Sequence, residues 1–373
     1  MVETLDRIEQ AGSSAVPPQM RAAVIREYGS DPQIETVPVP RPQAGEALVK
    51  VLATGLCATD LKVISGALSH STALPRIPGH EVAGIVAECA EAPGLVGKRV
   101  ALYLYESCGE CRFCLSGRET LCAEARRPGI ERDGGLAEYV CVDHRTLLTV
   151  EPETNIQSAA VAMDAVLTPW GALVGKGRIV AGDDVAVIGC GGLGSNAVQI
   201  AVGLGARVAV ADPQESHRQM GLDLGAELAV APEDIGRIVE WSKDRDGVAV
   251  ALETSGHRSG FDSAVACLAP AGRVVCNGYQ PGLEYGLDSS RLVLEEIEVL
   301  GSRVASLSQA RDALDAVEDG RVKPRIMRSM PLEELGKALG MLRAGEVEGR
   351  LVLLPGGTAD AERRPETSER STR

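Results

Sequence analysis

The stretch that decides the fold runs from Asp183 to Asp212 and reads DDVAVIGCGGLGSNAVQIAVGLGARVAVAD. It begins with an apolar run of strand length, Val185–Ile188, and continues into a glycine-rich turn. A helical pattern then extends to Leu204, and a second strand-like run, Arg207–Ala211, ends directly before Asp212. This order of strand, glycines, helix, strand and acid predicts a dinucleotide-binding α/β unit.

The turn and the final acid of this unit supply its predicted cofactor-binding residues. The turn residues are Gly189, Gly191, Gly192, Leu193 and Gly194. Glycines let the backbone approach a pyrophosphate, and the N-terminus of the following helix offers unpaired N–H groups. The Asp212 carboxylate can accept hydrogen bonds from both hydroxyls of an adenosine ribose and would repel a 2′-phosphate. The unit therefore predicts NAD, rather than NADP, as the cofactor.

Composition limits the class of protein. A chain of 373 residues is long enough for two domains. Its net charge of −14 argues against a nucleic acid or an anionic membrane as partner. We see no apolar run near the ~20 residues of a membrane span and no secretory signal pattern, so a cytoplasmic protein is expected. Ten cysteines in such a chain indicate metal ligands before disulfides.

The chain divides by its patterns into an arm, two domains and a tail. Residues 1–18 lack apolar periodicity and are predicted to form a flexible arm, and the polar residues 356–373 a disordered tail. Short β-like runs separated by Gly and Pro turns predict a β-rich, barrel-like domain over residues 19–165. Alternating strands and helices over residues 166–304 predict a six-stranded, doubly wound parallel sheet. Residues 305–355 are expected to return to the first domain.

Four cysteines form the sharpest metal-binding motif, Cys108-x2-Cys111-x2-Cys114-x7-Cys122. Four thiolates this close in sequence can complete a tetrahedral shell around zinc and leave no open position. An iron–sulfur cluster is the main alternative. The bacterial ferredoxin run, however, has a shorter last spacing followed by proline, whereas Ala123 follows here. The spacing predicts a structural zinc site.

Three further candidate ligands are dispersed: Cys57 in GLCATD, His80 in PGHE and Asp164 in AMDAVLTPWGAL. Taken singly, each has an ordinary structural explanation as a buried thiol, a turn histidine or a helix N-cap. Composition alone does not join them into one site.

Together these motifs resemble those of the zinc-dependent medium-chain alcohol dehydrogenases, from about residue 20 to residue 354. The resemblance rests on GLCATD, PGHE, the four-cysteine lobe, the glycine turn with Asp212, and the closing stretch Gly349–Val352. It implies a GroES-like catalytic domain split around a Rossmann domain, with the active site in the cleft between them. It also implies two zinc ions per chain, one catalytic and one structural, and a homo-oligomer, with a tetramer favoured over a dimer.

The resemblance assigns the catalytic zinc to Cys57, His80 and Asp164, with Glu81 close behind the metal. It makes Asp60 the residue that orients the His80 ring. Asp164 stands where many members have a second cysteine. A carboxylate is a harder donor than sulfur, so we expect a more acidic zinc that is held less tightly.

Three other residues take their roles from the same resemblance. Thr59 would hydrogen-bond the substrate oxygen and accept its proton, and Arg350 would reach the cofactor pyrophosphate. Lys62 stands where many members place a histidine that relays protons to solvent. A lysine can serve there only if its pKa is lowered; otherwise water carries the proton.

The predicted function is interconversion of a small-molecule alcohol and an aldehyde or ketone by hydride transfer to or from NAD. Two alternatives stay open: reduction of a conjugated C=C bond on the same fold, and a non-catalytic, zinc-stabilised dinucleotide-binding protein. A medium-sized apolar substrate is suggested by four residues near the motifs, Ile64, Leu68, Tyr105 and Trp170. The other histidines are expected at the surface or in loops, and the other cysteines in the core: His70, His144, His217 and His257; Cys89, Cys141, Cys190, Cys267 and Cys276.

Overall fold

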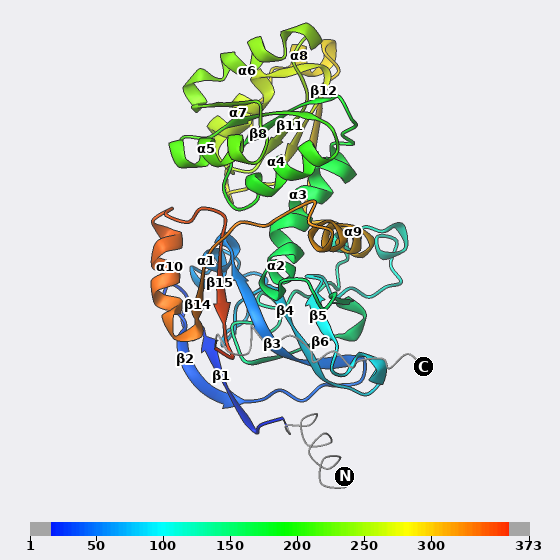
Figure 1. Ribbon diagram of the computed structural model, residues 1–373, viewed down its shortest axis with the longest axis vertical. Helices are drawn as coiled ribbons and strands as arrows, with labels where there is room; N and C mark the ends of the chain where they lie inside the picture. Colours follow the sequence, from blue (N-terminus) through cyan, green and yellow to red (C-terminus); the bar gives the residue numbers. More distant parts are fainter. Residues whose placement is uncertain (1–15, 358–373) are drawn as a thin grey trace, which may run out of the picture.

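The computed structural model describes residues 16–357, so most of the predicted arm and tail lies outside the described residues. Figure 1 shows two parts, a parallel sheet with its helices above and a β-rich part below, with a helical segment running between them. The predicted fold class, a β-rich domain combined with a doubly wound parallel sheet, is confirmed.

The parallel sheet contains the dinucleotide-binding unit at its centre. Its six parallel strands lie in the order β10-β9-β8-β11-β12-β13, so the order in which successive strands are added reverses between β8 and β11. The strands are β8 (Asp184–Ile188), β9 (Arg207–Ala211), β10 (Leu228–Val230), β11 (Val248–Glu253), β12 (Leu268–Cys276) and β13 (Glu298–Gly301). In open α/β sheets the ligand lies beyond the carboxyl ends of the strands at such a reversal.

Alternate residues of β8 enter two different cores, which is why the strand is apolar throughout. Val185 and Val187 pack into the core that includes the helices after β8 and β9, and Ala186 and Ile188 into the core on the other face. The helices of this part are α4 (Gly194–Gly203), α5 (Glu215–Asp223), α6 (Gly236–Trp241), α7 (Arg258–Ala266) and α8 (Ser289–Leu294).

The lower part is built on a seven-stranded sheet in the order β14-β15-β3-β4-β5-β7, with β6 paired to β3. Its strands are β3 (Glu46–Leu56), β4 (Glu81–Cys89), β5 (Arg99–Leu102), β6 (Tyr139–Asp143), β7 (Leu147–Thr149), β14 (Ile326–Pro331) and β15 (Arg350–Leu354). A separate two-stranded sheet joins β1 (Gln19–Val24) and β2 (Gln33–Pro38). β15 pairs antiparallel with β3, so the last strand of the described chain lies in the sheet of the β-rich part.

A continuous helical segment, Ile156–Lys176, connects the two parts. It consists of α2 (Ile156–Val161), the π-helical turn η6 (Ala162–Val166), α3 (Leu167–Trp170) and a second π-helical turn, η7 (Gly171–Lys176). The segment is apolar and long enough to span a membrane, which corrects our expectation that the chain holds no such run. It is 83% buried inside the fold and is therefore a core helix.

Candidate active site and metal centres

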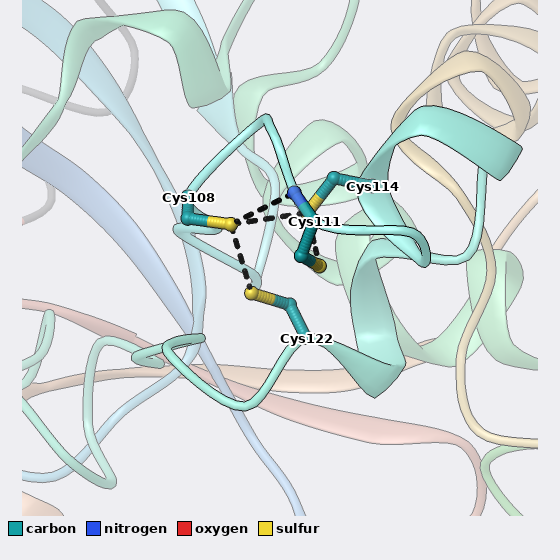
Figure 2. A group of neighbouring side chains, drawn as sticks. All are labelled: Cys108, Cys111, Cys114 and Cys122. Carbon is teal, nitrogen blue, oxygen red and sulfur yellow. Dashed lines mark hydrogen bonds between the residues drawn. The ribbon is translucent and has the colours of Figure 1, made fainter.

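The four cysteines predicted to hold a structural zinc lie together in one lobe of the β-rich part (Figure 2). Their Sγ atoms are 3.8 Å apart for Cys108 and Cys114, 3.5 Å for Cys111 and Cys114, and 3.6 Å for Cys108 and Cys122. A tetrahedral ion with Zn–S bonds of about 2.3 Å holds its sulfurs about 3.8 Å apart. The four thiols therefore fit a closed zinc site with no position for substrate.

The second candidate centre joins residues from three separate segments. Cys57 lies between β3 and α1 (Ala58–Ile64), His80 directly precedes β4, and Asp164 lies in η6. The Cys57 Sγ is 3.4 Å from Asp164 Oδ2, and the His80 Nε2 is 3.7 Å from the same oxygen. With Glu81 included, the four candidate ligand atoms all lie within 4.8 Å of one another, and all four residues are buried.

Two neighbours fix the orientation of these ligands. Asp60 Oδ1 is 3.2 Å from His80 Nδ1, so the other ring nitrogen, Nε2, faces Cys57 and Asp164. Asp60 Oδ2 also accepts from the Cys57 backbone N–H at 2.9 Å, which ties the two ligand segments together. The Thr168 hydroxyl donates to Asp164 Oδ1 at 2.7 Å and leaves Oδ2 toward the centre. Asp60 thus lies where it can orient the His80 ring.

Burial and neighbouring charges shift the pKa values of the two carboxyl groups at this centre in opposite directions. Burial would raise the pKa of Asp164, but His80, Arg350 and the Thr168 hydroxyl hold it well below its usual range. Burial raises the pKa of Glu81 to about 8, against the pull of Arg350, and Glu81 Oε2 is buried with no hydrogen-bond partner. A sulfur, an imidazole nitrogen and carboxylate oxygens are ligands that zinc accepts. The residues present therefore fit a zinc ion.

Arg350 lies between this centre and the glycine-rich turn. Its Nε donates to Glu81 Oε1 at 2.9 Å, and its Nη2 is 3.4 Å from Asp164 Oδ2. A Cβ added at Gly192 would lie 1.7 Å from Arg350 Nη1, so the guanidinium also contacts the turn. The sequence predicted only a role toward the pyrophosphate. Its contacts with Glu81 and Asp164, two of the candidate metal-binding residues, were not predicted.

The glycine-rich turn needs its glycines for different reasons. Gly189 has φ +92°, a left-handed conformation that disfavours side chains. A Cβ at Gly194 would lie 1.9 Å from Gly189 O, so residue 194 must be glycine for the turn to close. A Cβ at Gly191 would meet no protein atom within 4 Å, which leaves its backbone open to a ligand. Leu193 directly precedes α4, whose N-terminus faces this turn.

Asp212 lies directly after β9 and is buried. Its Oδ2 accepts from the Cys190 backbone N–H at 2.7 Å, and its Oδ1 accepts from the Gln214 backbone N–H at 2.9 Å. The His217 Nδ1 is 3.2 Å from Oδ1. Burial would raise the pKa of Asp212, but His217 and the two N–H donors hold it below its usual value. The prediction that His217 is a surface or loop residue is wrong: it is buried on α5, with Nε2 unpartnered.

The two predicted proton-handling residues both lie on α1. Thr59, in its first turn, is half-buried two residues after Cys57. The Lys62 Nζ donates to the Tyr279 carbonyl at 3.1 Å and lies 3.6 Å from the centroid of the Tyr279 ring. Tyr279 follows β12, so this contact joins the two parts of the molecule. Burial lowers the pKa of Lys62, against the opposing charge of Cys57, and a lowered pKa is what a relay requires.

The four residues suggested as a substrate lining lie in two different hydrophobic cores and not in one common lining. Ile64 and Leu68 pack in the core of the β-rich part, whereas Tyr105 and Trp170 belong to the core around the connecting helix. Sequence reasoning also missed Thr168 and Tyr279. Thr168 follows Asp164 by one helical turn, a spacing that could have revealed it. Tyr279 reaches Lys62 only through the tertiary fold, so no local pattern marks it.

The remaining histidines and cysteines mostly lie as expected. His70 and His257 are exposed, and His144 is half-buried, with its Nδ1 2.7 Å from the Gly45 carbonyl oxygen. All ten cysteines are free. Four of the five that lie outside the two centres are buried, and Cys276 is half-buried. Burial raises the pKa of Cys190, in the glycine-rich turn, to about 12, which makes it a packing residue.

Two family models match the chain. Residues 43–152 match the alcohol dehydrogenase GroES-like domain, and residues 192–319 match the zinc-binding dehydrogenase domain. An alcohol dehydrogenase from Moraxella sp. (strain TAE123) is 34% identical over 339 residues, which are 90% of this chain and 99% of the relative.

Solved structures are similar over almost the same length. The alcohol dehydrogenase of the archaeon Aeropyrum pernix has a TM-score of 0.84 at 28% identity and covers 90% of this chain and 100% of its own. Acetophenone reductase from Geotrichum candidum, solved in complex with NAD, has a TM-score of 0.80 at 30% identity and covers 91% of this chain and 98% of its own.

Proposed function

The chain belongs to the zinc-type medium-chain dehydrogenase/reductase family, and from that premise we propose the residues and cofactors with which it works. It is an NAD-dependent alcohol oxidoreductase: its full-length relatives include alcohol dehydrogenases and a solved NAD-dependent alcohol dehydrogenase. We propose that it interconverts a small-molecule alcohol and an aldehyde or ketone. No feature of the described residues favours reduction of a C=C bond or a purely binding role.

One observation carries this proposal: Cys57, His80 and Asp164 converge beside a glycine-rich turn that belongs to a different sheet. Arg350 contacts both, through Glu81 and Asp164 on one side and Gly192 on the other. A binding protein would need the turn but not the buried cluster of ligands. An enzyme that transfers hydride needs both, because substrate oxygen and nicotinamide must meet.

We propose that Cys57, His80 and Asp164 hold one zinc ion, with Glu81 close behind it, and that the four-cysteine lobe holds a second. A catalytic zinc acts as a Lewis acid that polarises the substrate oxygen and lowers the pKa of an alcohol. Asp60 and Thr168 hold the ligands in place. We assign Thr59 to hydrogen-bond the substrate oxygen and to receive its proton, and Lys62 to pass that proton on toward solvent.

For NAD we propose the backbone of Gly189, Gly191, Gly192, Leu193 and Gly194 as the pyrophosphate site, with Arg350 at its edge. The N-terminus of α4, a ten-residue helix, adds its positive dipole end to this site. Asp212, at the end of β9, is proposed to accept the ribose hydroxyls. Its negative charge disfavours the 2′-phosphate of NADP.

The same proposal includes a division of the chain at residues 165/166 and 304/305, with the first boundary inside the connecting helix. We propose a homo-oligomer, a tetramer rather than a dimer, in the cytoplasm. β13 is an edge strand of the parallel sheet, and Val293 and Leu294 of α8 are 69% and 81% exposed. An open edge and exposed apolar side chains favour pairing with a second copy. Free cysteines suit a reducing compartment.

The test combines metal content with turnover. Protein purified without added metal should contain about two zinc ions per chain and oxidise alcohols with NAD⁺ when assayed on a broad panel. Asp164→Asn should lose turnover and one zinc, while Asp183→Asn, a change in an exposed loop before β8, should keep both. Absence of NAD⁺ reduction across alcohols, together with absence of NADH oxidation across carbonyl compounds, would contradict the proposal.

A further inference from the structure

We propose that the alcohol this enzyme oxidises carries a carboxylate, and that Arg303 binds that carboxylate at the mouth of the cleft, with Tyr105 and Arg127 beside it. The inference rests on the proposed function and names the substrate class of the same site. It follows from where Arg303 lies, how far it is from the metal-binding residues, and which charges surround it.

Arg303 lies beyond the carboxyl ends of the strands toward which the reacting end of NAD must extend. Asp212 at the end of β9 takes the adenosine ribose, and the pyrophosphate lies at the turn after β8. The rest of the dinucleotide must therefore extend the other way, over β11, β12 and β13. Arg303 follows the carboxyl end of β13 by two residues. Its segment is anchored there, because the Ser302 N–H donates to the Cys276 carbonyl at 2.9 Å.

The segment after Arg303 also lies against the helix that carries Asp164. A Cβ at Gly171 would be 2.2 Å from Val304 O, so the two backbones are in direct contact. The Tyr103 hydroxyl donates to the Ala305 carbonyl at 2.7 Å and holds this segment to the β-rich part. Gly171 follows Asp164 by two helical turns, about 10 Å at 1.5 Å per residue. A small molecule with its hydroxyl at the metal-binding residues can span such a distance.

The charges around Arg303 favour the binding of a ligand group with a single negative charge. The Cζ atoms of Arg303 and Arg127 lie 5.3 Å and 5.8 Å from the centroid of the Tyr105 ring, which is buried between them. Arg127 is neutralised by Glu131, to which its Nε donates at 2.9 Å. Arg303 is exposed, and no acidic side chain among residues 16–357 forms an ion pair with it.

Two guanidiniums and one carboxylate leave a net charge of +1 beside the Tyr105 hydroxyl. Burial raises the pKa of that hydroxyl, against the two arginines, so it stays protonated and can donate. A planar guanidinium with free donors binds a carboxylate in bidentate fashion. A phosphate dianion would exceed the available charge. The cluster therefore matches a carboxylate, in a protein whose net charge of −14 otherwise repels acidic substrates.

The test compares ω-hydroxycarboxylates of three to eight carbons with n-alkanols of the same length, using NAD⁺ and zinc-loaded enzyme. We expect the wild-type kcat/KM to favour the hydroxycarboxylates, with the preference peaking at one chain length. A hydrogen bond to a charged group contributes about 1.5–3 kcal/mol, or about 10- to 150-fold. Arg303→Gln should reduce the ratio of hydroxycarboxylate to alkanol kcat/KM by that factor, chiefly through KM, and Arg303→Lys should restore part of it.

Arg321→Gln is the matched control, because Arg321, in the turn after α9, is exposed and within residues 16–357 forms an ion pair with Asp319 alone. Its substrate ratio should equal that of the wild type. The carboxylate proposal would be overturned if the wild type had equal kcat/KM for hydroxycarboxylates and alkanols. It would also be overturned if the ratio of these two kcat/KM values were the same in Arg303→Gln as in Arg321→Gln. In either case, turnover of alkanols would still support the proposed function. Inactivity toward every alcohol would overturn both.

Discussion

Alanine at Gly194 tests whether the glycine-rich turn is as tight as the structure has it. The added Cβ would lie 1.9 Å from the Gly189 carbonyl oxygen and 2.8 Å from its carbon, whereas real Cβ contacts are essentially never under 3.0 Å. Both neighbours are backbone atoms, which cannot rotate away. The turn must therefore open by about 1 Å, and such overpacking costs about 1–3 kcal/mol.

The control lies in the same helix. Gly203 ends α4, and a Cβ there would meet nothing within 4 Å. Gly203→Ala should therefore stabilise the protein by up to about 1 kcal/mol, because alanine favours the helix. Gly191→Ala should leave the stability nearly unchanged, since its Cβ also meets no protein atom. It should nevertheless weaken NAD⁺ binding, because that Cβ occupies the space proposed for the pyrophosphate.

Thermal unfolding and calorimetric titration with NAD⁺ separate these effects. For a domain of this size, 1 kcal/mol shifts Tm by roughly 2–4 °C, so Gly194→Ala should lower Tm by about 4–8 °C for a loss of 2 kcal/mol. It should also weaken NAD⁺ binding, since the opened turn displaces its N–H groups. A Gly194→Ala protein with the Tm of the wild type and the same affinity for NAD⁺ would refute the close approach of Gly194 to Gly189.

Four further predictions concern single residues. Asp164→Ala should lower the zinc content by about one ion per chain while the cysteine-lobe zinc stays; unchanged metal analysis would remove Asp164 from the ligands. Burial lowers the pKa of Lys62 below its usual 10.5, so Lys62 loses its proton as pH rises through that lowered value and can then accept one. The kcat/KM for alcohol oxidation should therefore rise with pH below 10.5, and Lys62→Ala should abolish that limb; an unaltered pH profile would exclude a relay. With a pKa of about 12, Cys190 should resist iodoacetamide at pH 8 until the protein unfolds, as read by peptide mass spectrometry. Asp212→Asn should shift the NADP⁺/NAD⁺ ratio of kcat/KM toward NADP⁺ by about 10- to 150-fold, the contribution of a hydrogen bond to a charged group; an unchanged ratio would show that Asp212 does not bind the ribose.

The parts of the fold that follow from local pattern could be predicted. The strands β8 and β9 begin at Asp184 and Arg207, within one residue of the predicted runs, because each is a short apolar run next to turn residues. β2 and β7 were not predicted: β2 exposes much of its length, and β7 has three residues, so neither carries a clear apolar pattern.

The site was harder to predict because its residues are far apart in sequence. The four-cysteine lobe is local and could be identified from spacing alone. Cys57 and Asp164 are separated by 107 positions and meet only because the connecting helix passes the end of β3. That Cys57 and Asp164 belong to one site was predicted from the family resemblance and not from a local sequence pattern. The burial of His217 was missed because it lies on a largely polar helix and depends on its contact with Asp212, not on an apolar face.

The placement of Arg350 links the two halves of the site more closely than their sequence motifs suggest. One edge of its guanidinium balances Glu81 and Asp164, and the other lies at Gly192, where the pyrophosphate is proposed to bind. A cation bound by Cys57, His80 and Asp164 would neutralise part of the negative charge of these carboxylates. The positive charge of Arg350 would then attract the phosphate more strongly. Metal and dinucleotide would then strengthen each other's binding, and by linkage the effect must be equal in both directions. A single buried side chain thereby couples a centre in the β-rich part to a turn in the part built on the parallel sheet.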